Sequence, residues 1–134
     1  MKKEIGKRLF YCLIFSLSLS LIFSWTNYQS TEGFEAKQGS FLFVIFTFIY
    51  CFFNFFGSLT AFLNLNLKIR ENIFLSAISF LSLPIIILLW LFNEFLAKKN
   101  DNETIQLFLL FSMPSISYIL ALTYHFIKFR RKLN

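Results

Sequence analysis

Four long stretches without any Asp, Glu, Lys or Arg dominate this sequence. They cover residues 9–31, 38–67, 72–93 and 104–127, which make up 99 of the 134 residues. A helix needs about 20 mostly apolar residues to cross a bilayer, and one charge at its centre costs about 2.5–3.5 kcal/mol. We therefore expect an all-α, polytopic membrane protein, one domain over residues 1–134, with transmembrane helices at about 9–25, 41–63, 73–96 and 105–127.

Strands are the competing interpretation, because the chain is rich in aromatic and β-branched residues. Membrane barrels alternate polar and apolar side chains over strands of about ten residues. Runs such as FLFVIFTFIY and PIIILLWLF do not alternate. Helices also satisfy their own backbone hydrogen bonds in lipid, so we expect helices throughout.

The first stretch also resembles a secretory signal peptide, since MKKEIGKR precedes LFYCLIFSLSLSLIF. Ser18 and Ser20 offer a serine-based cleavage site, but no A-x-A pattern follows them. We therefore expect this stretch to remain as the first membrane span.

The positive charges are distributed unequally between the two sides of the expected spans. An even number of spans puts both termini on one side, which then holds ten basic residues against three on the other. The ten are Lys2, Lys3, Lys7, Arg8, Lys68, Arg70, Lys128, Arg130, Arg131 and Lys132. Because short cytoplasmic loops carry the excess of Lys and Arg, we expect an antiparallel bundle with both termini cytoplasmic, in a bacterial inner membrane.

The net charge of +6 does not indicate a nucleic-acid partner. The expected cytoplasmic segments carry the positive charge, where it orients the spans and attracts anionic lipid head groups. The connections, at about 26–40, 64–72 and 97–104, are too short to fold separately. Whatever the chain does, it does within the bilayer or through short loops.

A stripe of small and polar side chains runs along the second span. Its members, Thr47, Cys51, Asn54, Ser58 and Ala61, are spaced 4, 3, 4 and 3 residues apart, and phenylalanines occupy the other faces. This is the repeat of a left-handed helix pair, and small residues mark contact faces in membranes. The stripe predicts a helix interface, with Asn54 bonding to a neighbouring helix.

The first span carries a second stripe at every fourth position, formed by Cys12, Ser16, Ser20 and Ser24. Such a small-xxx-small series favours a right-handed crossing. Spans 3 and 4 offer smaller groups, namely Ser76, Ala77, Ser79 and Ser82, and Ser117, Ala121 and His125. All four faces can pack inward on one another. The alternative is that one stripe binds a second copy or another protein, and span 2 is our candidate for that role.

Two prolines interrupt the later spans. Pro84 ends the triplet Ser82-Leu83-Pro84, and Pro114 ends the similar triplet Ser112-Met113-Pro114. Each removes a backbone donor and predicts a helix kink. Paired interruptions of this kind also occur at transporter binding sites, so both interpretations stay open.

The chain lacks the residue groups that most membrane enzymes and metal sites use. It has one aspartate, Asp101, one histidine, His125, and no C-x-x-C motif. Glu94, at the outer edge of span 3, lies four residues before Lys98 and is explained by a helical ion pair. We therefore expect no enzyme activity, no metal and no cofactor.

These observations lead to an interaction protein. We expect a small multi-pass protein that binds another membrane component, as an immunity-type protein or an accessory subunit. Its partners would be membrane lipids and a membrane protein or a second copy of itself. The alternative is an oligomeric small pore or a lipid- or solute-transport subunit, with a water-accessible line of Ser, Thr and Asn.

Overall fold

The structure, a computed structural model, describes residues 1–97 and 102–132. Over these residues the chain forms helices and no strand, which confirms the all-helical expectation. The elements are α1 (Lys2–Ser30), α2 (Phe34–Gly57), the 3-10 helix η1 (Ser58–Leu65), α3 (Leu67–Glu71), α4 (Ile73–Ala97) and α5 (Asn102–Arg130).

Four of the helical segments are long and apolar enough to cross a membrane. They are Lys2–Ser30, Lys37–Leu65, Ile73–Ala97 and Leu107–Arg130, so the expectation of four candidate spans is confirmed. The helices extend beyond the predicted spans, most of all α1, whose first turn contains Lys2, Lys3 and Glu4. Polar helix ends of this kind can continue past the hydrocarbon, because the chain there meets head groups and water.

Burial is inverted relative to a water-soluble protein. Phe53 and Phe74 expose 64% and 71% of their surface, whereas Ser16 and Asn54 are fully buried. Large contiguous apolar surfaces are rare on soluble monomers. Hydrocarbon is the solvent that suits this surface, so the burial pattern supports a membrane protein independently of helix length.

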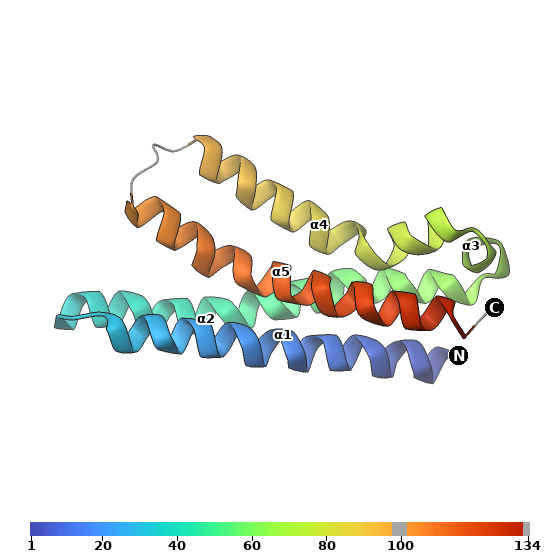
Figure 1. Cartoon of the computed structure of the whole chain (residues 1–134), viewed down its shortest axis with the longest axis horizontal. Coiled ribbons are helices and arrows are strands. Elements are labelled where there is room, and N and C mark those ends of the chain that lie inside the picture. The colour runs from blue at the N-terminus through green and yellow to red at the C-terminus, as the bar shows by residue number, and fades with distance from the viewer. Residues whose placement is uncertain (98–101, 133–134) are drawn as a thin grey trace.

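The helices do not all pack equally closely. α1 contacts α2 and α5 extensively, α4 packs mainly on α5 and η1, and α2 contacts α4 only sparsely. Figure 1 shows α4 and α5 leaning away from α1 and α2 toward the α4–α5 connection, while both termini lie at the other end of the molecule. We call the end with both termini the terminal end. The apolar core includes Ile5, Leu9, Phe80, Tyr118 and Leu122.

The second span differs from the regular α-helix that the sequence predicts. After Gly57 it tightens into η1, in which residues three apart lie on one face. Ser58, Ala61 and Asn64 are consequently all buried on that face. The Thr60 hydroxyl donates to the carbonyl oxygen of Ser79 at 2.7 Å, which ties η1 to α4.

Pro84 and Pro114 lie inside α4 and α5, and both are fully buried. Both helices bend partway along in Figure 1. A proline ring removes one helical hydrogen bond and is a common cause of such bending.

Replacing Gly57 with alanine should destabilise the protein. A Cβ built at Gly57 meets the Cβ of Leu83 at 2.9 Å, and neither atom can rotate away. We expect the free energy of unfolding to fall by about 1–3 kcal/mol, as for other overpacked sites. Thermal unfolding in detergent, followed by circular dichroism, measures the change.

Gly39→Ala is the matched control, because nothing lies within 4 Å of a Cβ at Gly39. Alanine there should be neutral or stabilising by up to about 1 kcal/mol. Equal melting temperatures for Gly57→Ala and wild type would show that α2 and α4 do not approach this closely.

Candidate functional site

Both predicted stripes lie in the interior of the helix bundle. The side chains of Thr47, Cys51, Asn54, Ser58 and Ala61 are at most 3% exposed. Those of Cys12, Ser16, Ser20 and Ser24 are at most 2% exposed. The structure therefore favours inward packing, and neither stripe is available at the surface of the single chain.

The two stripes meet each other along α1 and α2. The hydroxyls of Ser24 and Thr47 lie 2.8 Å apart, and the Ser16 hydroxyl lies 3.4 Å from the Cys51 sulfur. Thr47 also donates to the carbonyl oxygen of Phe43 at 2.8 Å. Because apolar surroundings supply no competing partners, each hydroxyl finds one within the bundle.

The α1 stripe also contacts α5 beside its proline. Ser16 donates to the carbonyl oxygen of Pro114 at 2.9 Å, and its hydroxyl lies 3.0 Å from that of Ser117. The hydroxyls of Ser20 and Ser117 are 3.3 Å apart. Ser117 thus joins two positions of α1, as the small residue expected on span 4.

Asn54 connects α2 to α5. Its side-chain nitrogen donates to the Ser115 hydroxyl at 3.1 Å and to the carbonyl oxygen of Tyr50 at 2.8 Å. One turn on, the hydroxyls of Ser58 and Tyr118 lie 2.5 Å apart. Ser115 and Tyr118 were not singled out from the sequence, because each looks like an ordinary member of an apolar run.

A second buried amide, Asn64, organises the contact between η1 and α4. Its side chain bonds to the hydroxyl of Ser79, and Ser76 donates to its oxygen at 2.5 Å. Sequence reasoning ended the span before Asn64 and missed it. The signal was present in the spacing, since Ser58, Ala61 and Asn64 continue the stripe at steps of three.

Charged residues join the two chain ends at the terminal end. Arg8, only 6% exposed, donates to the carbonyl oxygen of His125 at 3.1 Å and pairs with Glu4 at 3.0 Å. Lys132 also reaches Glu4, at 2.8 Å. We interpreted these charges from the sequence only as orientation signals, because their approach depends on α1 and α5 being neighbours.

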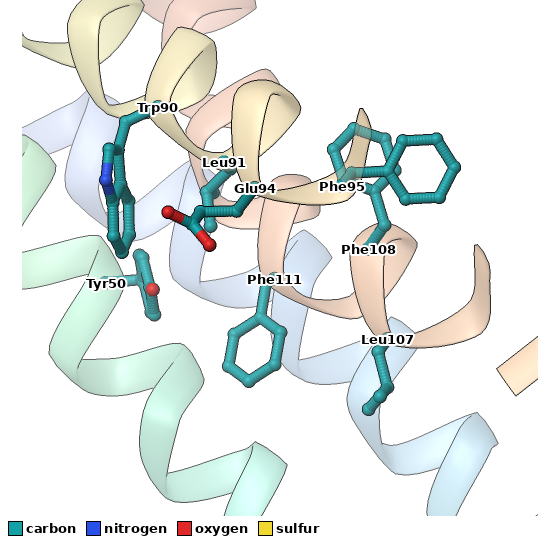
Figure 2. Close-up of a pocket in the computed structure, with 8 residues that line it drawn as sticks. All are labelled: Tyr50, Trp90, Leu91, Glu94, Phe95, Leu107, Phe108 and Phe111. Atoms are coloured by element: carbon teal, nitrogen blue, oxygen red, sulfur yellow. The ribbon is translucent and has the colours of Figure 1, made fainter. Parts of the chain in front are cut away.

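The most distinctive surface feature is a cavity of about 340 Å³ among α2, α4 and α5 (Figure 2). We call it the aromatic groove. Its lining residues are Tyr50, Trp90, Leu91, Glu94, Phe95, Leu107, Phe108 and Phe111. It lies where α4 diverges from α2, toward the end of the molecule opposite the termini.

Ring contacts hold the walls of the groove. Phe111 meets Tyr50 with ring centroids 5.7 Å apart, and Phe95 stacks on Phe108 at 4.5 Å. Phe111 also packs edge-on against Phe43 at 5.3 Å. Aromatic pairs at these separations contribute about 0.5–1.5 kcal/mol each beyond their buried area.

Among the residues that the structure describes, Glu94 is the one acidic side chain that lines the groove. Figure 2 shows its carboxylate directed among the rings of Tyr50, Trp90 and Phe111. In residues 1–97 and 102–132 no ion pair or hydrogen bond of this carboxylate is found. The partner predicted for it, Lys98, lies outside the described residues.

A second hollow of about 350 Å³ adjoins the groove and shares Tyr50 and Trp90 with it. Its lining is otherwise apolar, from Phe46, Ile49, Phe53 and Ile87. We call it the apolar extension. A further hollow of about 650 Å³ lies between α1 and α5 beside His125 and carries no carboxylate in its lining.

Sequence reasoning missed the groove. The sequence pattern pairs Glu94 with Lys98 and indicates no site at Trp90. Trp90 and Glu94 are four residues apart and so share a helix face. They converge with Tyr50 and Phe111 because α4 leans away from α2. The residue pattern of a single helix does not predict that angle.

The described residues include no group of three or more His, Cys, Asp or Glu side chains that could hold a metal ion. The chain matches no protein-family model, and no curated protein or solved structure is significantly similar to it. Its function must therefore be argued from the groove and the bundle interior.

Cys12 and Cys51 should resist thiol reagents in the folded protein, because both are free and fully buried. A membrane-impermeant maleimide applied to broken membranes reaches both faces. We expect no labelling until the protein is denatured. Gln29→Cys, an exposed position at the end of α1, is the positive control. Rapid labelling of Cys51 would instead place water beside Ser16 and Asn54.

Proposed function

We propose that the chain is a multi-pass protein of a bacterial cytoplasmic membrane, with four antiparallel spans and both termini cytoplasmic. Two observations support this orientation. Ten basic residues gather on the side of the termini against three on the other. Both termini also lie at one end of the molecule in Figure 1.

We further propose that the protein acts by binding another membrane component in the aromatic groove, as an immunity-type protein or an accessory subunit. The observation that carries this proposal is the groove itself. The hydroxyls of the stripes bond to one another and to α5 inside the bundle, whereas the groove offers rings at the surface and a carboxylate with no partner among the described residues. Concave, mostly apolar sites with few polar groups are typical of ligand binding.

The proposal does not include catalysis. The ionisable side chains of the groove are Glu94 and Tyr50, and neither has a histidine, cysteine or second carboxylate beside it in the lining. General acid–base or nucleophilic chemistry usually needs such a pair within hydrogen-bond reach.

An oligomeric pore or a lipid- or solute-transport subunit is the alternative. The hydroxyls and amides that follow one another from Ser24 and Thr47 to Asn64 favour it, because they form a polar line along the bundle. The maleimide experiment separates the two, since a pore requires water beside Cys51.

Reporter fusions test the orientation. Alkaline phosphatase joined to residue 1 or 132 should be inactive, and green fluorescent protein at the same positions should fluoresce. Reporters inserted after Glu32 should give the opposite result, because the α1–α2 connection would lie outside. Active phosphatase at either terminus would contradict the proposed orientation.

Photocrosslinking tests binding in the groove. We expect p-benzoylphenylalanine at Phe53, which lines the apolar extension and is 64% exposed, to give one discrete adduct in native membranes. The same substitution at Phe48, which is exposed on α2 about 140° around the helix from Phe53 and lies outside the lining of the extension, is the control and should give only background. Ile87→Phe should reduce the Phe53 adduct by filling the extension. Equal adducts at both positions would contradict a specific site.

A further inference from the structure

The carboxylate of Glu94 is exposed in the open groove, where it lies beside ring faces and apolar side chains, and the described lining residues include no cationic side chain. A charge beside apolar groups loses hydration, and this cost falls when an opposite charge approaches. The groove therefore favours an occupant that presents a positively charged group over one that presents only neutral or anionic groups.

The rings select among cations. The faces of Trp and Tyr carry negative potential, and organic ammonium groups bind in cages of such rings. Trp90, Tyr50 and Phe111 surround the direction in which Glu94 points (Figure 2). A small hydrated metal ion would lose its water without gaining enough oxygen ligands, since Glu94 is the only carboxylate among the described lining residues.

The apolar extension adds a place for hydrocarbon. It shares Trp90 and Tyr50 with the groove and presents Phe, Ile and Trp side chains along α2 and α4. The groove has a volume of about 340 Å³ and its extension one of about 350 Å³, and each lies within the range of pockets that hold small ligands. A charged compartment next to an apolar one suits an amphiphile.

We propose that the aromatic groove binds the ammonium head group of a membrane lipid, whose acyl chain lies in the apolar extension. Glu94 pairs with the ammonium group, and Tyr50, Trp90 and Phe111 enclose it. This inference rests on the proposed function, because it names the component that the groove binds. It adds a head-group preference that groove binding alone does not require.

The test uses Trp90 as a local reporter. The chain has two tryptophans, so Trp25→Phe leaves Trp90 as the single one. This variant is reconstituted in mixed vesicles in which either phosphatidylethanolamine or phosphatidylglycerol carries brominated acyl chains. Bromine quenches a tryptophan that it touches, so quenching at equal mole fraction reports which lipid occupies the extension.

We expect brominated phosphatidylethanolamine to quench Trp90 more strongly, with a relative binding constant of about ten, equivalent to about 1.4 kcal/mol. The net charge of +6 would favour phosphatidylglycerol over the chain as a whole, so a preference for phosphatidylethanolamine does not follow from the net charge. Glu94→Gln should reduce the ratio to one or below. Glu94→Asp, which keeps the charge, should retain part of it.

Glu32→Gln is the matched control, because it removes an equal charge from an exposed position in the α1–α2 connection, at the same end of the molecule as the groove and outside its lining. It should leave the ratio unchanged. Circular dichroism and size-exclusion profiles must match wild type for every variant compared. If Glu94→Gln does not meet this criterion, the relative binding constant of the two lipids is compared between wild type and Glu94→Asp.

Three results would overturn the inference. Equal quenching by both lipids would remove the head-group preference, and a preference unaffected by Glu94→Gln would remove the role of Glu94. If soluble benzyltrimethylammonium, present during irradiation, prevents the Phe53 adduct and no lipid preference is found, the occupant would be a soluble cation instead. If the adduct at Phe53 persists while the lipid preference is absent, the proposed function stands and this inference fails. If neither a specific Phe53 adduct nor a lipid preference is found, the proposed function and this inference are both contradicted.

Discussion

The structure depends on the cost of leaving a hydroxyl or amide unpaired in hydrocarbon. Lipid offers such groups no partner, and it also gives little reason for apolar helices to associate. Hydrogen bonds between side chains in the bundle interior meet both constraints, because they pair polar groups and join helices. Ser16 reaches Cys51 and α5, Asn54 reaches Ser115, and Asn64 reaches Ser76 and Ser79. Each bond contributes modestly, on average about 0.6 kcal/mol in membranes, but together they fix which helix faces which.

The same constraint explains why the groove stands out. The hydroxyls along the stripes have partners inside the bundle, whereas the buried side-chain oxygen of Asn54 has none among the described residues, and the remaining surface is largely apolar. Glu94 departs from this rule, because its carboxylate points among rings with no partner found in the described residues. A carboxylate at an apolar groove is a reasonable place to look for a function, because ligand sites combine an apolar lining with a few polar groups.

The fold was predictable to the extent that one-dimensional patterns determine it. Uncharged stretches gave the four candidate helices, and the spacing of Ser16 or Asn54 indicated which faces carry contacts. Whether those faces met each other or a second chain depended on packing, which spacing does not encode. Arg8 shows the same limit, because its burial follows from the approach of His125, over a hundred residues away. The groove was least predictable, since it arises from the divergence of two helices rather than from any single sequence pattern.

The tightening of the second span at Ser58 has a geometric consequence. A 3-10 helix rises about 2.0 Å per residue against 1.5 Å for an α-helix, so the eight residues of η1 extend about 16 Å rather than 12 Å. The segment gains about 4 Å of reach without an added residue. The second span thereby carries Lys68 and Arg70 farther toward the terminal end, with Asn64 held against α4 on the way.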